Sequence, residues 1–249
     1  MKVAIRPQLV YRPQIAIKPQ ERTYQFVLSR YIMEHSEMTG VIVFGSQRTG
    51  KSSYAMQVLY DIYQDWNTVL DHIFFKLEDV VRFLMVQIKT GRIIPAFVWD
   101  DAGVYGSKQL YFTKRRLVEY LQNLFDVIGT AVKGVILTTP SPENLLKALR
   151  SYEFYRVKIV KHNQYYRRIA QGYKNVLLPS GTRYIRKMYR DYFDVRLPKD
   201  VYEEYIKIRK SYLDNTLDNL NEFLQEMALK GKIEKETLKN QIKGMKGEG

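Results

Sequence analysis

The chain has 249 residues, 45% of them hydrophobic and 27% charged, which is enough for one large core domain with appendages. Forty Lys and Arg against 26 Asp and Glu give a formal net charge of +14. This excess favours a polyanionic partner: nucleic acid, nucleotide or an acidic membrane surface. The absence of cysteine excludes disulfides and thiolate metal sites. No apolar run approaches the roughly 20 residues that span a bilayer, and residues 1–20 lack the apolar stretch of a secretory signal. We expect a cytoplasmic protein without a transmembrane segment.

Residues 1–20 are expected to form an extended arm. A Pro-Gln pair preceded by a basic residue recurs every six residues, at Arg6-Pro7-Gln8, Arg12-Pro13-Gln14 and Lys18-Pro19-Gln20. Proline fixes φ and lacks a hydrogen-bond donor, so the repeat is typical of an extended or polyproline segment. Such an arm would lie along a neighbouring subunit or on DNA; a disordered tail is the alternative.

Residues 21–160 show the alternation of strands and helices that predicts an α/β core with a mainly parallel sheet covered on both faces. The strands are expected at 40–44, 71–75, 93–99, 134–137 and 154–160. The helices are expected at 21–34, 52–66, 77–89, 115–128 and 143–150.

The remaining chain divides into two segments of different composition. Residues 161–198 are rich in Tyr and Arg and contain turn signals, so we expect a basic extension of antiparallel strands. Residues 199–249 are predicted to be helical. Leucines and one methionine recur there with a 4-3-4-3 spacing, which favours docking on the chain's own core over a coiled coil.

A glycine-rich loop predicts a phosphate site between the strand at 40–44 and the helix that follows. Residues 45–52, GSQRTGKS, fit the pattern G-x-x-x-x-G-K-[ST] in full. Glycines let backbone N–H groups point at phosphate oxygens, and the helix N-terminus adds positive potential. Lys51 is expected to reach the β- and γ-phosphates of ATP, and the Ser52 hydroxyl to bind Mg²⁺. The expected nucleotide-binding residues are Gly45, Ser46, Gln47, Arg48, Thr49, Gly50, Lys51, Ser52 and Ser53.

Two adjacent acids end the buried strand at 93–99, within the sequence VWDDAG. Two like charges there are costly unless a cation offsets their repulsion. We expect Asp100 to hold Mg²⁺ through its water shell and Asp101 to polarise the attacking water. Asp is one methylene shorter than the Glu often found at the second position. Two acids on a surface turn are the alternative, which the apolar run before them fits poorly.

These motifs resemble those of the additional-strand P-loop ATPases. GSQRTGKS, VWDDAG and the following LTTPSP carry the resemblance, which covers residues 40–160. The paired acids are similar to those of DnaA/DnaC-like AAA+ replication ATPases, and the layout resembles small ATPases of archaeal viruses and plasmids. The strand-rich extension is more similar to the HerA/FtsK translocases. The resemblance implies a P-loop NTPase three-layer sandwich, ATP and Mg²⁺ as ligands, a homo-oligomer and, for a viral protein, the host cytoplasm.

Two further site residues are expected from this resemblance. A polar residue on the strand between the P-loop strand and the acid strand would face the γ-phosphate. Thr138 or Thr139 fits this role. The catalytic candidates are Lys51, Asp101 and Thr139. Ordinary strand residues are the alternative. Arg150 is a candidate arginine finger for a neighbour's nucleotide; a solvated helix end is the alternative.

The segment from Leu145 to Arg190 predicts a DNA-facing surface. It contains 12 Lys and Arg, seven Tyr and a single acid, Glu153. Basic side chains neutralise backbone phosphates and aromatic rings stack on bases. The alternative is that the tyrosines face the core and the basic residues line a solvated face. No base-reading module is recognisable, so binding without sequence specificity is expected. The candidate DNA contacts are Arg156, Lys158, Arg167, Arg168, Arg183, Arg186 and Lys187.

Three functions follow from these patterns. The first is an ATP-driven oligomeric motor or remodeller that translocates or packages DNA. The second is a replication ATPase, either an initiator or a helicase loader. The third is a nucleotide-dependent scaffold with little turnover. A small-molecule kinase is a minor fourth option, because Lys114-Arg115-Arg116 could imitate the lid of such an enzyme.

Overall fold

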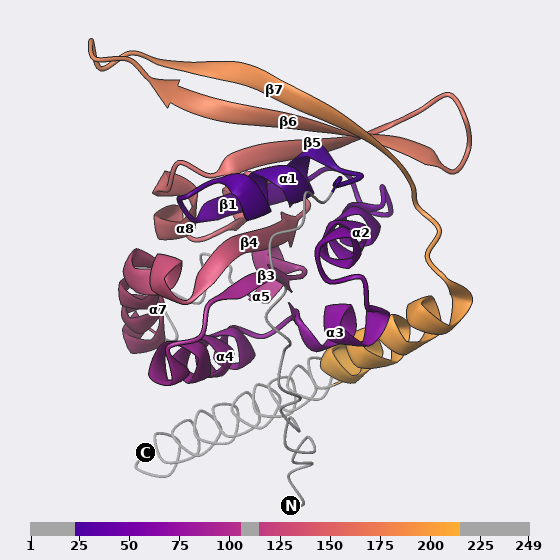
Figure 1. The fold of residues 1–249 in the computed structure, drawn as a ribbon, viewed down its shortest axis with the longest axis horizontal. Helices are drawn as coiled ribbons and strands as arrows, with labels where there is room; N and C mark the ends of the chain where they lie inside the picture. The colour runs from indigo at the N-terminus through magenta and orange to yellow at the C-terminus, as the bar shows by residue number, and fades with distance from the viewer. Residues whose placement is uncertain (1–22, 106–114, 215–249) are drawn as a thin grey trace, which may run out of the picture.

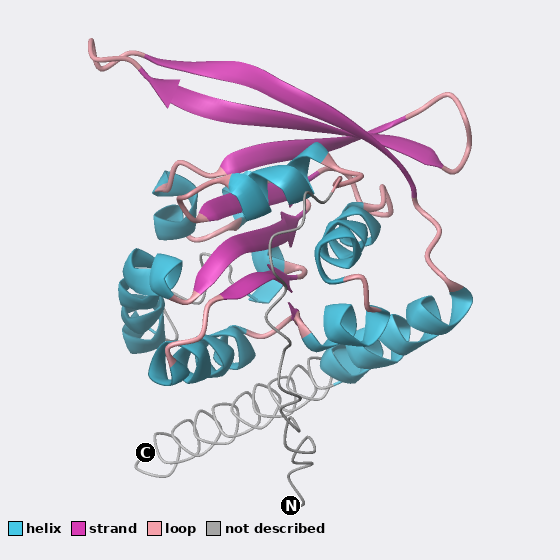
Figure 2. Cartoon of the chain, viewed as in Figure 1, coloured by secondary structure: helices cyan, strands magenta, loops and turns pink. Residues whose placement is uncertain are grey.

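A single seven-stranded sheet forms the frame of the molecule (Figures 1 and 2). The computed structural model describes residues 23–105 and 115–214, so the predicted arm and most of the C-terminal segment lie outside the described residues. The strands are, in sheet order, β2 (Ile73–Phe74), β3 (Ile94–Trp99), β4 (Val132–Thr139), β1 (Thr39–Phe44), β5 (Tyr155–Lys161), β6 (Arg167–Leu177) and β7 (Arg183–Asp194). The first five pair in parallel, and β6 and β7 continue the sheet antiparallel. The expected mainly parallel α/β sheet and its strand-rich extension are confirmed.

Helices cover both faces of the parallel part. The helices are α1 (Val27–Glu34), α2 (Lys51–Tyr63), α3 (Trp66–Asp71), α4 (Leu77–Thr90), α5 (Ala102–Tyr105), α7 (Arg115–Val127), α8 (Lys147–Ser151) and a helix at residues 199–214. Along β1, Val41 and Val43 pack with α1, α2 and the helix at 199–214, whereas Ile42 packs with α4 and α7. Successive strand side chains point to opposite faces, so the fold is a three-layer sandwich.

The order of the strands identifies the fold as that of a P-loop NTPase with an additional strand. β4 lies between β1, which precedes the glycine-rich loop, and β3, which precedes the paired acids. The parallel strands are buried on both faces, which explains why their sequences read as continuous apolar runs instead of alternating ones. In the described part of the chain, no helix has the length and apolar character needed to cross a membrane.

Three helix predictions and one strand prediction were wrong in their bounds. The helix expected at 21–34 begins at Val27, and the strand expected at 71–75 is confined to Ile73–Phe74, because Asp71 belongs to α3. The helix expected at 52–66 ends at Tyr63, because Gln64 takes a left-handed φ of 57° and Asp65 caps α3 by accepting from Thr68 N–H. The helix expected at 143–150 is a 3₁₀ turn at Pro142–Asn144 followed by α8. Leu145 and Leu146 are extended between the two, and both side chains are buried.

The N-terminus of α1 is held by two carboxylates from elsewhere in the chain. No side chain of α1 itself caps it. Asp61 of α2 accepts from the N–H groups of Gln25 and Phe26 at 3.1 and 3.0 Å. Asp191 of β7 accepts from the N–H groups that follow, those of Val27 and Leu28, at 2.9 and 3.4 Å. Carboxylates at a helix N-terminus satisfy free donors and interact favourably with the helix dipole, so α1 is fixed to both α2 and β7.

Asp191 also joins β7 to α2. The Tyr54 hydroxyl donates to Asp191 Oδ2 at 2.7 Å, and both residues are buried. Burial raises the pKa of Asp191, while the bonds from Tyr54 and from the α1 backbone lower it. β7, the edge strand of the basic extension, is therefore bonded to α2, the helix that follows the glycine-rich loop.

Replacing Asp191 by Asn is expected to lower the free energy of unfolding by about 1–3 kcal/mol. The introduced amide would set N–H donors against the α1 backbone and the Tyr54 hydroxyl. Equilibrium urea unfolding measures the loss. Asp194→Asn, at the more exposed end of the same strand, is the matched control and should cost clearly less. Equal losses in the two variants would contradict the role of Asp191.

Candidate nucleotide site

The glycine-rich loop connects β1 to α2 through backbone conformations that few residues adopt. Gly50 has a φ of 95°, and Arg48 one of 59°. A Cβ atom on Gly50 would lie 2.6 Å from Cγ1 of Val195, so the loop is also closely packed at this point. The Thr49 hydroxyl donates to the Ser46 carbonyl at 2.8 Å and closes the loop. No side chain caps α2, whose first N–H groups are therefore available to an anion in the loop.

Lys51 lies in the loop as the sequence predicts. Its Nζ donates to the carbonyl oxygens of Gly45 and Ser46 at 3.1 and 2.9 Å. Burial lowers the pKa of Lys51, and the nearby Asp101 and Asp100 raise it. These carbonyl partners are weak substitutes for an anion, so phosphate oxygens entering the loop would compete for the same ammonium group.

Asp100 is the most strongly bonded acid of the site. Its carboxylate is buried and accepts three hydroxyl donors: Ser52 Oγ at 2.9 Å, Thr138 Oγ1 at 2.5 Å and Tyr205 OH at 2.6 Å. These donors come from α2, from β4 and from the helix at 199–214. The two residues predicted to bind Mg²⁺, Ser52 and Asp100, are thus in direct contact.

The residues present fit a magnesium ion held jointly with phosphates. Mg²⁺ prefers hard oxygen ligands and is usually bound by one or two carboxylates together with substrate phosphates and water. Ser52 and Asp100 supply a hydroxyl and a carboxylate oxygen beside Lys51. Among residues 23–105 and 115–214, no group of three or more His, Cys, Asp or Glu could hold a metal unaided.

Asp101 stands next to Asp100 but has different partners. Its φ of 51° is left-handed, which is uncommon outside glycine, and its N–H donates to Thr138 Oγ1 at 2.9 Å. Arg209 Nη2 donates to Asp101 Oδ2 at 2.7 Å. Burial and the charge of Asp100 raise the pKa of Asp101, while Arg209 and Lys51 lower it. The guanidinium therefore offsets the repulsion between the two acids.

Of the two threonines that end β4, it is Thr138 that contacts the acids. Its hydroxyl donates to Asp100 and accepts from the Asp101 N–H. The Thr139 hydroxyl donates instead to the Ser141 carbonyl at 2.8 Å, and a Cβ on Gly103 would meet it at 2.3 Å. Adjacent strand residues point to opposite faces, so only one of the pair can reach the carboxylates. Thr139, which was among the candidates to face the γ-phosphate, makes no hydrogen bond to the acids in this structure.

The sequence did not predict Tyr205 and Arg209 as site residues. They lie one turn apart on the helix at 199–214, so both reach the acids from the same helix face. Val201, Tyr205 and Tyr212 are buried on this helix, and their helical spacing could have indicated a face that docks on the core, although the docking prediction used only the leucines and the methionine farther along the chain. The target of that docking had no sequence signal, because the partners are more than 100 residues away.

Arg150, the predicted arginine finger, is paired within its own chain. Its Nη1 donates to Glu143, and its Nε is buried without a hydrogen-bond partner. Its predicted role toward a neighbouring subunit stays a prediction.

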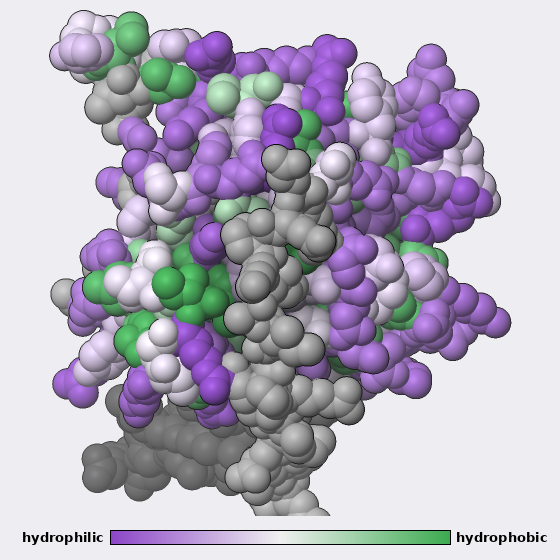
Figure 3. All heavy atoms as spheres, in the orientation of Figure 1, coloured by the Kyte–Doolittle hydropathy of each residue, from purple (hydrophilic) through white to green (hydrophobic). Residues whose placement is uncertain are grey.

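The predicted DNA contacts lie on β5, β6 and β7, and the two outer strands form a ribbon that extends beyond the core (Figure 1). We call residues 167–194 the β6–β7 ribbon. Near the core, Tyr189, Asp191 and Phe193 of β7 are buried, whereas Tyr184, Ile185 and the following Arg186 and Lys187 are all exposed. Figure 3 shows a largely hydrophilic surface along this ribbon, with hydrophobic residues near its tip. Thus some tyrosines do face the core, and others are free to contact a partner.

Replacing Tyr205 by Phe is expected to lower the free energy of unfolding by about 1–3 kcal/mol, because one oxygen of the buried Asp100 loses its donor. Urea unfolding of the nucleotide-free protein measures this. Tyr202→Phe, 52% exposed on the same helix, is the control and should have little effect. In the background of Asp100→Asn the Tyr205 substitution should cost less, which a double-mutant cycle detects. Additive effects would contradict the contact.

Comparisons with known proteins place this site in a viral family. No protein-family model matches the chain. It is 30% identical over 198 residues to "Uncharacterized protein B-251" of Sulfolobus spindle-shape virus 1, covering 74% of this chain and 78% of that protein. It is 36% identical over 125 residues to "Uncharacterized protein ORF286" of Acidianus two-tailed virus, covering 49% of this chain and 44% of that protein.

Similar solved structures are more distant. They include the N-terminal domain of zonular occludens toxin from Neisseria meningitidis, at 11% identity, 68% of this chain, 98% of that chain and a TM-score of 0.40. The flagellar accessory protein FlaH from Methanocaldococcus jannaschii shows 10% identity, 68% and 97% coverage and a TM-score of 0.36. At these scores the likeness carries no inference about activity. The fold assignment comes from the sheet order and the loop, and the family from the viral relative: the chain belongs to the family of protein B-251 of Sulfolobus spindle-shape virus 1.

Proposed function

We propose that the protein is a Mg²⁺-dependent ATP hydrolase that acts on DNA as an oligomeric motor or remodeller, in translocation or packaging. The convergence of Lys51, Ser52 and Asp100 at the mouth of the glycine-rich loop carries this proposal. A lysine bonded to the loop backbone and, next to it in the sequence, a hydroxyl bonded to a buried carboxylate are the groups that binding and transfer of a phosphoryl group require.

In this proposal each residue of the site has a separate task. The loop N–H groups and Lys51 hold the phosphates. Ser52 and Asp100 would hold Mg²⁺, and the bound ion would supply positive charge near the phosphoryl oxygens. Asp101 orients the attacking water after its carboxylate exchanges Arg209 for that water, and Thr138 keeps the backbone of Asp101 in place.

The β6–β7 ribbon is the proposed DNA-binding element. In the outer part of β7 the consecutive residues 184–187 are exposed, and they carry basic and aromatic side chains together. Because basic side chains release counterions from phosphates, binding of this kind is strong at low salt and does not depend on base sequence. The ribbon continues the same sheet as the nucleotide site, so movement of the sheet edge would be transmitted between them.

A nucleotide-dependent scaffold with little turnover is the second candidate. The specific observation in its favour is that Asp101 is already engaged by Arg209 and that Asp100 already accepts three hydroxyl donors. A site that keeps these contacts after ATP binds would hold the nucleotide and hydrolyse it slowly.

DNA is expected to stimulate steady-state ATP hydrolysis, and Lys51→Ala to lower kcat by about a hundredfold or more, because it removes a cation from the transferring phosphoryl group. The rate should be measured with single-stranded DNA, with double-stranded DNA and without DNA, over a salt series. Nucleotide binding without DNA-dependent turnover would favour the scaffold.

Charge reversal on the ribbon separates DNA action from chemistry. Arg186→Glu with Lys187→Glu should weaken DNA binding and reduce the slope of log affinity against log salt by about 0.9 for each lost phosphate contact, while the basal rate persists. Arg82→Glu with Lys89→Glu on α4 changes the net charge equally and is the matched control. Equal loss of DNA affinity in both double variants would contradict the ribbon as the DNA-binding element.

A further inference from the structure

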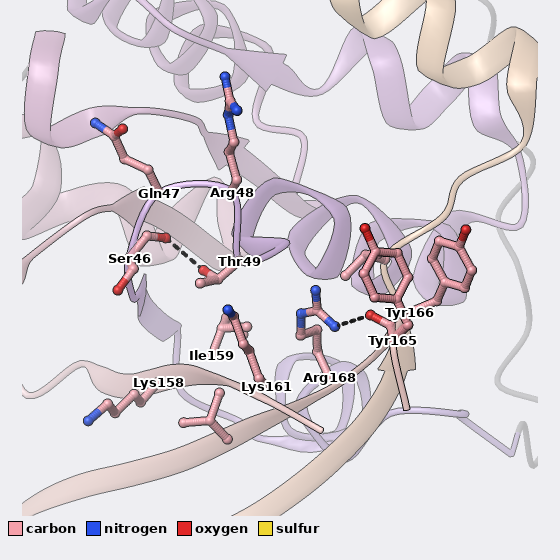
Figure 4. A pocket seen from close by; sticks show the side chains of 12 residues that line it. Ser46, Gln47, Arg48, Thr49, Lys158, Ile159, Lys161, Tyr165, Tyr166 and Arg168 are labelled. Carbon is pink, nitrogen blue, oxygen red and sulfur yellow. Dashed lines mark hydrogen bonds between the residues drawn. The ribbon is translucent and has the colours of Figure 1, made fainter. Parts of the chain in front are cut away.

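A pocket lies beside the glycine-rich loop, on the side away from Asp100 and Asp101, and neither acid lines it (Figure 4). Its volume is about 720 Å³, within the range of small-molecule sites. Loop residues 46–49 form one wall, and the C-terminal end of β5, the β5–β6 turn and the start of β6 form the other. The pocket is thus continuous with the predicted phosphate loop.

The charge of this pocket is one-sided. Arg48, Lys158, Lys161 and Arg168 line it, and no carboxylate is present among its described lining residues. Arg168 Nη1 donates to the carbonyl oxygens of Tyr165 and Arg167 at 2.7 and 2.8 Å, while its Nε is buried without a partner. The surrounding cations favour an oxygen-rich or anionic ligand.

Two aromatic rings complete the pocket. Tyr165 is 81% exposed and Tyr166 is 45% exposed, and their rings lie 4.8 Å apart at an interplanar angle of 83°. The turn is held in place, because the Val195 N–H donates to the Tyr166 carbonyl and the Arg196 guanidinium lies 4.3 Å from the Tyr166 ring centre. In Figure 4 Arg168 lies between Lys161 and these rings. The exposed Tyr165 ring offers a face on which an aromatic base can stack, and Tyr166 lies edge-to-face beside it.

The sheet order indicates which end of a nucleotide would reach this pocket. Asp100 and Asp101 follow β3, and Thr138 lies near the end of β4, so the acids and the threonine that contacts them lie on one side of β1. β5 lies on the other side of β1. If the γ-phosphate of a bound nucleotide lies at the acids, its nucleoside end therefore points the other way, toward β5.

We infer that this pocket is the subsite for the nucleoside half of the nucleotide, with the base against Tyr165 and Tyr166 and the sugar or α-phosphate at Arg168. The inference rests on the proposed binding of ATP at the loop. The competing source of a base at the same rings is a DNA strand on the neighbouring ribbon.

Calorimetric binding of Mg-ATP and of inorganic tripolyphosphate tests this without relying on turnover. The double variant Tyr165→Ala/Tyr166→Ala should weaken ATP binding about tenfold or more and leave tripolyphosphate binding unchanged, because only ATP has a base. Tyr165→Phe/Tyr166→Phe keeps both rings and should keep wild-type ATP affinity. Tyr184→Ala, an exposed tyrosine farther along the ribbon, is the control for loss of a ring elsewhere.

Three outcomes would overturn the inference, and they are distinguishable. Unchanged ATP affinity in the alanine variant, with tripolyphosphate still bound, would reject the subsite and leave the proposed function standing. Weaker binding of single-stranded DNA with unchanged ATP affinity would assign the rings to DNA. Failure of the wild-type protein to bind either ATP or tripolyphosphate would reject both the subsite and the proposed function.

Discussion

The buried carboxylate of Asp100 is the contact on which the rest of the site depends. A charge in a dry environment is costly unless donors surround it, and three hydroxyl groups from three different elements meet that need here. The same bonds fix α2 at its first turn, β4 at its end and the C-terminal helix across the acids. A requirement of one side chain for solvation thus becomes a constraint on the relative positions of three elements.

A second buried carboxylate repeats this arrangement at the other side of α2. Asp191 binds Tyr54 of α2 and the free N–H groups of α1, so β7 cannot be placed independently of the helix that begins at the glycine-rich loop. Ser52 and Tyr54 lie two residues apart on α2, and through them the acids of β3 and the root of the β6–β7 ribbon are connected by less than one helical turn. The proposed DNA-binding element and the nucleotide site are therefore both bonded to the first turn of α2.

The sequence predicted what local patterns encode and missed what distant segments supply. The glycine-rich loop, the apolar strands and the antiparallel extension each carry their signal within a few residues, and the structure has them where they were expected. Which of Thr138 and Thr139 turns to the acids depends on which face of the sheet each side chain points to. The sequence is equally compatible with either orientation of β4. The break at Leu145 and Leu146 exists because two leucines are buried in extended conformation, a tertiary effect. Tyr205 and Arg209 had no local signal for their targets, since only the folded chain brings them to Asp100 and Asp101.

The short connection between the ribbon and the C-terminal helix has a consequence for dissecting this protein. β7 ends at Asp194 and the helix begins at residue 199, so only residues 195–198 connect them. Each of these residues can span at most about 3.3–3.6 Å, which keeps the helix close to the end of β7. It is also anchored, because Gln57 donates to the Asp194 carbonyl and Val195 packs against Gly50. A recombinant fragment that stops at Lys161 would retain every residue of the recognisable motifs and still leave Asp100 and Asp101 without two of their partners. The smallest fragment that keeps both partners of the acid pair must extend through Arg209. The segment that contains the sequence motifs is therefore shorter than the segment needed to complete the site.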